Sequence, residues 1–231
     1  MRPQESDLVR DLPLFRGMSD SQFDHLVHAA FLQRFPAHVA LIKEGDLPDF
    51  LHVVVEGAVE LFSAHRGGET TIDILLPVRT FILAAVIQDD VYLNSARALV
   101  PSRILMIPAQ AVRDIFGQDA VFARAVVSEL ALRYRGVVRE LKNQKLRNGI
   151  ERLAAWILRA DAHAGGAGKF AFAYDKRTIA ALLGMTPENL SRNLATLSAD
   201  CIVSEGREIT ITQRDRLMRI ATPNPLIDAE G

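Results

Sequence analysis

Residues 176–197 constrain the fold of this chain more than any other stretch, because they read as two short helices that meet at a glycine. The first helix carries Ile179, Leu182 and Leu183 on one side. Gly184 can adopt the left-handed backbone conformation that a tight corner between two helices requires. The pattern therefore predicts a helix-turn-helix.

The second predicted helix has a strong start signal and two unlike faces. Thr186 is a good N-cap, Pro187 suits the first helical position, and Glu188 lies where the helix dipole favours an acid. The positions expected to face the core are Leu190, Leu194 and Leu197, and the polar sides carry Glu188, Ser191, Arg192 and Asn193. Recognition helices of DNA-binding proteins present such side chains to base edges. An ordinary helical corner with a polar face is the alternative at this point.

A hairpin is predicted directly after the second helix. Cys201–Val203 and Ile209–Ile211 are short strand-like runs, and Gly206 lies in the turn between them. This is the position of a wing in DNA-binding folds, and Arg207 near its tip is placed to meet a phosphate.

Composition restricts the class of protein. The chain has 231 residues, enough for one large domain or two modest ones. Residues 1–20 lack the apolar segment of a signal peptide, and no apolar run is long enough to span a bilayer. The single cysteine, Cys201, excludes an intramolecular disulfide, so we expect a cytoplasmic protein. We interpret Cys201 as a small buried residue, with a redox sensor as the alternative.

Charge is divided unevenly along the chain. Residues 1–109 hold nine Lys and Arg against fourteen Asp and Glu, whereas residues 110–231 hold eighteen against fourteen. The imbalance favours two separate functions, with the nucleic-acid contact in the basic half.

The first half has the pattern of a β domain that follows a helical start. We expect helical structure over residues 7–31, then closely spaced antiparallel strands that form a sandwich or small barrel. The predicted strands are Val39–Ile42, Phe50–Glu56, Ala58–Ser63, Thr71–Leu76, Thr80–Ala84, Asn94–Leu99 and Arg103–Pro108.

Residues 110–146 form one long helical pattern with a narrow apolar seam. Its positions, at spacings of four and three, are Ala123, Val127, Leu130, Tyr134, Val137 and Leu141. This heptad repeat predicts a two-stranded coiled coil and hence a homodimer, the alternative being a helix that packs on its own domain. A second helix over Leu146–Ala162 and a strand over Lys169–Tyr174 are expected next, and the tail after Thr222 is expected to be loose.

A β domain, a long dimer helix and a winged helix-turn-helix, in that order, resemble one family. The chain is similar to the cyclic-AMP-receptor and fumarate–nitrate-reductase-regulator (Crp/Fnr) family of bacterial transcription factors over about residues 8–220. The shared motifs are Leu14–Met18, Glu44–Asp46, Phe50–Leu51, Glu56–Gly57 and Glu188–Arg192. The last matches the Glu-x-x-Ser-Arg signature of the fumarate–nitrate branch, and Pro187 stands where the cyclic-AMP branch has an arginine.

The resemblance implies an α+β fold in three parts. Residues 1–117 would form an effector-sensing, cyclic-nucleotide-binding-like β-barrel domain. Residues 118–146 would form the dimerisation helix, and residues 147–231 the winged helix-turn-helix DNA-binding domain.

The resemblance also implies how the second helix reads DNA. Arg192 would read a guanine, Glu188 the cytosine opposite, and Ser191 a neighbouring thymine. The residues expected at phosphates are Lys176, Arg177, Thr186, Asn189 and Arg207. A dimer would recognise a TTG-spacer-CAA palindrome in double-stranded DNA, with RNA polymerase as a further partner and no membrane contact.

The effector pocket expected by resemblance comprises Phe81, Leu83, Ala84, Asn94 and Ser95. Nucleotide-binding relatives hold the ribose with a Gly-Glu pair, where this chain has Leu83-Ala84. They hold the phosphate with an arginine-led triplet, where this chain has Asn94-Ser95-Ala96. Arg97 is expected on the opposite face of the strand from Asn94. An unpaired phosphate would be costly, so we expect an effector other than a cyclic nucleotide.

The sequence does not identify a cofactor. A single cysteine excludes the usual Cys-ligated iron–sulfur cluster. The apolar segment Phe81–Ile87 resembles nitric-oxide-responsive members of the family, some of which use haem, and haem needs an axial ligand such as histidine. The candidate histidines are His25, His28, His38, His52 and His65. For each of them, a surface or satisfied core histidine is the alternative.

Enzymatic motifs are missing from the sequence. It contains no nucleophile elbow, phosphate-binding loop, dinucleotide-binding glycine pattern or metal-ligand cluster, so we expect a protein that is not an enzyme. The remaining alternative to a regulator is a stand-alone ligand-binding or redox-sensing module without sequence-specific DNA binding.

Overall fold

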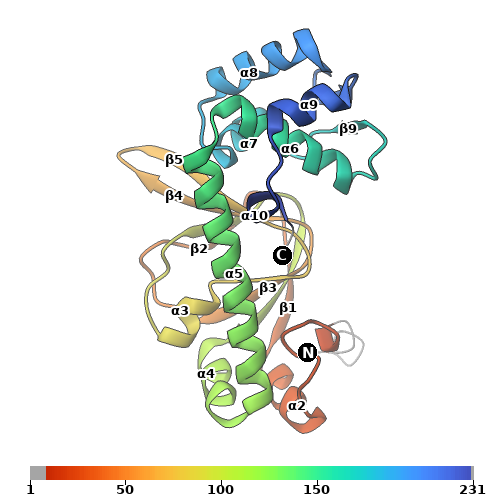
Figure 1. Cartoon of the computed structure of the whole chain (residues 1–231). Coiled ribbons are helices and arrows are strands. Elements are labelled where there is room, and N and C mark those ends of the chain that lie inside the picture. Colours follow the sequence, from red (N-terminus) through yellow and green to blue (C-terminus); the bar gives the residue numbers. More distant parts are fainter. Residues whose placement is uncertain (1–8, 230–231) are drawn as a thin grey trace. The chain divides into compact units, whose positions relative to one another are not determined.

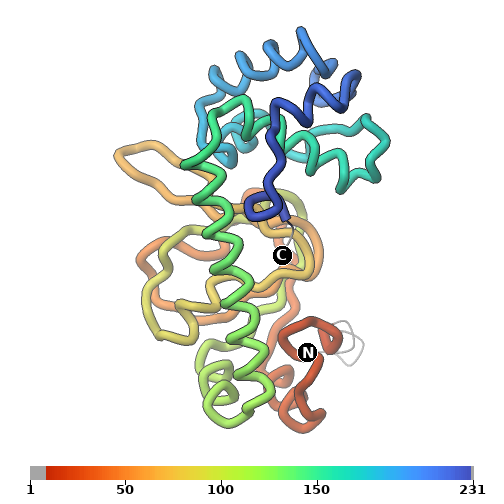
Figure 2. Tube along the Cα trace, in the orientation of Figure 1, coloured from red at the N-terminus to blue at the C-terminus, as the bar shows by residue number. Residues whose placement is uncertain are grey.

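The structure is a computed structural model and describes residues 9–229 (Figures 1 and 2). The chain divides into two compact units, Met1–Arg133 and Tyr134–Gly231. The boundary falls within the long helix α5 (Ala120–Leu146). None of the helices in the described part of the chain combines the length and apolar character that crossing a membrane requires.

The first unit is built around two four-stranded antiparallel sheets. One has the strand order β1 (Phe31–Phe35), β8 (Ser102–Pro108), β3 (Phe50–Glu56), β6 (Arg79–Phe81). The other has the order β2 (Ala40–Ile42), β7 (Ser95–Ala98), β4 (Val59–His65), β5 (Gly68–Leu75). The two sheets have no strand in common, so of the two expected forms, a sandwich or a small barrel, the first unit adopts the two-sheet sandwich.

Strands β3 and β8 are covered on both faces, which explains their nearly continuous apolar runs. On one face, Leu51 and Val53 join the core formed with the helices, which include α2 (Asp20–His28). On the other, Val54 and Ile104 join the core between the two sheets.

The start of the first unit differs from the prediction. Of the predicted helical range 7–31, residues 7 and 8 lie outside the described part, and α2 ends at His28. Phe31 already belongs to β1, where it pairs with Met106 of β8. That pairing joins residues far apart in the sequence, so local periodicity did not reveal it.

The predicted strand Thr80–Ala84 is also wrong in its second half. Strand β6 ends at Phe81, and helix α3 (Leu83–Gln88) follows. Leu83 and Val86 of α3 are buried in the core that also holds residues of the other helices. The apolar run is therefore divided between a strand and a short helix.

The predicted single helix over residues 110–146 is two helices, α4 (Ala109–Gln118) and α5, with a turn between them that can be followed in Figure 2. Asp119 between them has an extended backbone conformation. Its carboxylate accepts hydrogen bonds from the N–H groups of Val121 (2.7 Å) and Phe122 (3.2 Å). Asp119 thus starts α5 in the way an N-cap does.

The second unit contains α6 (Gly149–His163), β9 (Lys169–Ala171), α7 (Lys176–Leu182), α8 (Pro187–Asp200), β10 (Ile202–Glu205), β11 (Glu208–Ile211), α9 (Arg214–Ala221) and α10 (Pro225–Asp228). Helix α6 starts later than the predicted Leu146 because Asn148 and Glu151 form a capping box. Asn148 Oδ1 accepts from the Glu151 N–H at 3.0 Å, and Glu151 Oε2 accepts from the Asn148 N–H at 2.8 Å.

The predicted helix-turn-helix and hairpin are confirmed. Helices α7 and α8 meet at Gly184, whose φ is +60°. Strands β10 and β11 pair in an antiparallel hairpin, and β9 joins β11 to complete a three-stranded sheet. Strand β9 ends at Ala171, three residues before the predicted end.

The segment after Thr222 was expected to be loose, and this is wrong. It contains α10, whose N-cap Asn224 accepts a hydrogen bond from the Leu226 N–H at 2.9 Å. The Asp228 side chain binds Arg147, far away in the sequence. That long-range contact orders the segment, and local patterns could not predict it.

Candidate functional site

Helix α8 has a buried face and a polar exposed face. Leu190, Leu194 and Leu197 lie in the core of the second unit, as predicted. The exposed face carries Glu188, Asn189, Ser191 and Arg192, with Asn193 partly buried. The structure thus places the three predicted base-reading residues together, on the surface of the N-terminal half of the helix.

The exposed face carries opposite charges close to each other. The Arg192 guanidinium hydrogen-bonds to Asn189 Oδ1, one turn back along the helix. The pKa of Glu188 is lowered by hydrogen bonds from its own backbone N–H and the Thr186 hydroxyl, and by the charge of Arg192. Glu188 is therefore an anion at neutral pH. Its carboxylate can only accept hydrogen bonds, whereas the neighbouring Arg192 guanidinium can only donate them.

The predicted phosphate-contacting residues lie at the starts of α7 and α8. Thr186 caps α8, since its hydroxyl accepts from the Asn189 N–H at 3.2 Å. Lys176 and Arg177 are exposed in the first turn of α7, where Asp175 is the N-cap. These positions surround the N-terminal ends of both helices, where N–H groups also favour anions.

Arg207, the predicted phosphate contact of the wing, lies in the turn between β10 and β11. Its side chain is exposed, yet Nε and Nη2 both donate to the Phe172 carbonyl, at 3.1 and 2.8 Å. The guanidinium therefore holds the wing to the strand region next to it.

The predicted dimer seam on α5 is mostly exposed. Val127, Tyr134, Val137 and Leu141 have exposed fractions of 60, 70, 67 and 54%. Leu130 packs partly against the core of the first unit, with Phe122 and Val126. The N-terminal half of α5 therefore buries one apolar side in the core of the first unit, and the helix carries a second apolar stripe that is exposed.

The predicted effector-pocket residues are only partly brought together. Phe81 lies in the core between the two sheets. Leu83 lies in the helix-side core instead, and Ala84 is exposed. Ser95 and Asn94 are half-buried, and Ser95 Oγ accepts from the Glu44 N–H at 3.0 Å.

Arg97 is engaged elsewhere, as its position in the strand suggested. On β7, Ala96 and Ala98 face the inter-sheet side and Arg97 faces the other way. Its guanidinium donates to Glu60 at 2.6 Å and to Glu69 at 3.0 Å. Two carboxylates already neutralise this arginine.

His52 is the one buried histidine among the six, all of which lie in the described residues. It is on β3, on the same face as Val54, and its ring stacks on Phe81 with centroids 5.1 Å apart. Burial lowers the pKa of His52 to about 4, although a backbone hydrogen bond with Phe50 opposes this shift, and Nδ1 has no hydrogen-bond partner in the described structure. A neutral imidazole with a free nitrogen thus lies in an apolar core.

The other histidines considered above, His25, His28, His38 and His65, are exposed. Residues 9–229 contain no group of three or more His, Cys, Asp or Glu side chains arranged to hold a metal ion. Cys201 is buried, and burial raises the pKa of its thiol, which matches the interpretation as a small core residue.

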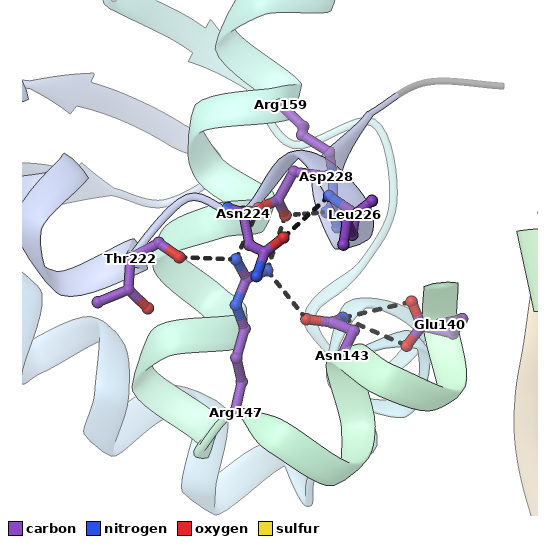
Figure 3. Close-up of polar contacts among 8 residues, drawn as sticks. All are labelled: Glu140, Asn143, Arg147, Arg159, Thr222, Asn224, Leu226 and Asp228. Carbon is purple, nitrogen blue, oxygen red and sulfur yellow. Dashed lines mark hydrogen bonds and ion pairs between the residues drawn. The ribbon is translucent and has the colours of Figure 1, made fainter. Parts of the chain in front are cut away.

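A polar cluster that no sequence pattern predicted lies where α5 meets α6. Arg147, in the link between the two helices, binds Asp228 of the tail, and Arg152 binds backbone carbonyls at the helix-turn-helix corner (Figure 3 shows the Arg147 cluster). The capping pair Asn148 and Glu151 was the local signal for a helix boundary here. Asp228 has no comparable local signal.

Two family models match the chain in the order that the fold suggests. Residues 32–119 match a cyclic nucleotide-binding domain, and residues 151–220 match a Crp-like helix-turn-helix domain. The chain belongs to the Crp/Fnr family. It is a DNA-binding transcription regulator, and Crp-like regulators typically bind DNA as dimers.

Known members of the Crp/Fnr family are similar along most of the chain. The cyclic AMP receptor protein of Thermus thermophilus is 27% identical over 200 residues, covering 86% of this chain and 91% of the relative. The fumarate and nitrate reduction regulatory protein of Vibrio cholerae is 24% identical over 186 residues, covering 78% and 74%. The structure of FixK2 from Bradyrhizobium japonicum has a TM-score of 0.72, with 22% identity over 84% of this chain and 98% of FixK2.

The buried His52 of this Crp/Fnr-family chain predicts a pH dependence of stability. Below the usual histidine pKa near 6.5, the unfolded chain binds a proton that the folded protein binds only near pH 4. The free energy of unfolding should therefore fall between pH 6.5 and 4, by up to about 3 kcal/mol from this residue. Urea unfolding of His52→Leu should lack this component, whereas His25→Leu, at an exposed site, should retain it. Equal pH slopes in all three proteins would show that His52 is not held neutral.

Proposed function

We propose that this Crp/Fnr-family regulator acts as a homodimer that reads a TTG-spacer-CAA palindrome. In this proposal residues 1–117 sense the effector, residues 118–146 form the dimer helix, and residues 147–231 bind DNA. Its partners are double-stranded DNA, a second copy of the chain and RNA polymerase.

The observation that carries this proposal is the exposed face of α8. Glu188, Ser191 and Arg192 lie together on it, free of the core. A guanidinium donates two bonds to guanine, and a carboxylate accepts from the amino group of cytosine, so this trio is suited to a G·C pair beside a thymine. Pro187 offers neither a backbone donor nor a long side chain to a neighbouring base.

The exposed stripe of α5 supports the dimer. Val127, Tyr134 and Val137 are all more than half exposed, which is an uncommon state for a row of large apolar side chains. Their heptad spacing matches a partner helix rather than a globular surface. A two-fold dimer would place the two α8 helices in successive major grooves, about 10 base pairs apart.

The sensing domain in this proposal responds to an effector other than a cyclic nucleotide. Of the predicted pocket residues, Asn94 and Ser95 carry no charge, and Arg97 is already bound by Glu60 and Glu69. A phosphate would thus lose water without gaining a cation, which is unfavourable.

His52 makes a haem-bound gas such as nitric oxide the effector that we propose. Its neutral ring and its Nδ1 without a hydrogen-bond partner make it the residue that would hold the haem, because the other four candidate histidines are exposed. His52 would hold the haem, which would supply an iron that binds the gas.

Base reading and backbone contact can be separated by substitution. Arg192→Ala should lose about 1–3 kcal/mol of discrimination at the guanine position, because its paired bonds are sequence-specific. Lys176→Ala should weaken binding to all duplexes alike. Selection from random duplexes, followed by titration of single-base variants, measures both. A selected motif that is not a palindrome or lacks TTG, or interchangeable effects of the two substitutions, would contradict the proposal.

The dimer seam can be tested with matched charges on one helix. Val137→Glu should give monomers that bind the palindrome weakly, because it places a carboxylate in the seam. Leu132→Glu, at an exposed apolar position off the seam, is the control and should stay dimeric. Light scattering at micromolar concentration distinguishes them. A monomeric wild-type protein, or identical behaviour of the two variants, would rule out the seam.

The effector proposal predicts an absorption spectrum. Protein purified without oxygen and supplied with haem should show a haem absorption band that shifts on addition of nitric oxide. His52→Leu should lose the band, and His25→Leu should keep it. Calorimetry with cyclic AMP should show no binding heat. Micromolar binding of cyclic AMP would contradict the proposal, as would a haem absorption band that is the same in the wild-type protein and in His52→Leu.

A further inference from the structure

The tail after Thr222 is bound to the corner between α5 and α6, as the close-up in Figure 3 shows. This segment lies beyond residue 220, where the match to the helix-turn-helix family model ends. The contacts described below all lie within the second unit, Tyr134–Gly231.

Arg147 is the centre of this contact. Its Nη1 donates to Asp228 Oδ1 at 2.7 Å, and its Nη2 donates to Asp228 Oδ2 at 2.6 Å. Nη2 also donates to the Thr222 carbonyl at 3.0 Å. The Arg147 side chain is only 4% exposed, so these paired bonds are shielded from water. Two-point pairing of this kind fixes orientation as well as distance.

Asp228 is held from several directions. Arg159 of α6 lies 3.3 Å from Oδ1, and the Asn224 N–H donates to Oδ2 at 2.7 Å. Burial alone would raise the pKa of Asp228. The hydrogen bonds from Arg147 and Asn224, with the charges of Arg147 and Arg159, outweigh burial and lower it. The carboxylate is therefore ionised at neutral pH. It connects α10 to α6 through Arg159 and to the corner between α5 and α6 through Arg147.

The same corner is tied to the helix-turn-helix on its other side. Arg152 Nη1 donates to the Arg147 carbonyl at 2.6 Å, and Arg152 Nε donates to the Leu183 carbonyl at 2.8 Å. Gln144 of α5 lies against Gly184, where an added Cβ would collide with its side chain. Arg147 also donates to Asn143 Oδ1 of α5 at 3.3 Å. Tail, dimer helix and helix-turn-helix corner thus share one connected set of bonds.

We propose that Arg147 and Asp228 are positioning residues for DNA binding, and that the tail contact sets the half-site spacing that the dimer accepts. This inference rests on the proposed dimeric recognition of a palindrome. Base reading depends on the α8 face alone, whereas spacing depends on how α8 is held relative to the C-terminal part of α5. Releasing Asp228 would loosen the corner in both protomers equally, because the two subunits are symmetric.

The test measures affinity against spacer length. Three duplexes carry the selected palindrome with its own spacer, or with one base pair added or removed. The wild-type protein should strongly prefer its own spacer. Asp228→Asn keeps the side-chain size and loses the charge, so its preference should fall about tenfold, while its affinity for a duplex with one half-site stays unchanged. Asp215→Asn, on the exposed side of α9, is the control and should keep the wild-type preference.

A second variant distinguishes loss of the tail contact from misfolding of the DNA-binding domain. Arg147→Lys keeps the positive charge but loses the paired bonds, and it should broaden the spacer preference in the same way. An unchanged spacer profile in both variants would overturn the inference, as would an equal loss of single half-site binding, which would indicate damage to the DNA-binding fold. If wild-type protein binds no palindrome, the proposed function itself fails, and this result is distinct from the other two.

Discussion

Helix α5 carries apolar side chains on two sides, and the first unit covers only one of them. Phe122 and Val126 are fully buried in the core of the first unit. Val127, Tyr134 and Val137 remain exposed to water. A stripe of this size is costly to leave in water, and a second copy of the same helix is the partner that its heptad spacing favours. The proposed two-fold dimer, and with it the proposed recognition of a palindrome, depends on this exposed stripe of one helix.

Helix α8 has separate faces for packing in the core and for the proposed contact with DNA. The leucines of α8 hold the helix in the core, so its polar face is available for the side chains that we propose contact DNA. The pKa of Glu188 is lowered first by its own backbone N–H and the Thr186 hydroxyl, and the charge of Arg192 adds to this effect. The wing arginine, Arg207, donates two hydrogen bonds to the Phe172 carbonyl. These bonds hold the hairpin in place.

The interior of the first unit is mostly apolar, and His52 is one of the few polar side chains buried in it. Burial keeps His52 neutral, and its stacking on Phe81 places it beside the end of β6, next to α3. A buried polar atom without a partner is uncommon and unfavourable in a folded protein. In the proposed function a ligand would satisfy this nitrogen, whereas Arg97 is already occupied by two carboxylates.

The amino-acid sequence by itself determined the elements whose signals are local. Gly184 marked the corner, Thr186 and Pro187 marked the start of α8, and Gly206 marked the wing turn, because caps and turns depend on residues a few positions apart. The heptad seam was equally visible in the sequence. The structure alone showed that most of it stays exposed while Leu130 packs on its own core.

Tertiary structure decided the features whose partners are distant in the chain. Phe31 joins a strand because it pairs with Met106, and such long-range pairings divide the strands of the first unit between two separate sheets. Arg147 and Asp228 are 81 residues apart, so no local pattern could show that the tail is held at the corner. The physical reason is the same in each case. Backbone pairing and buried ion pairs take their energy from groups that the fold brings together, whereas periodicity and capping report only on the nearest turns of the chain.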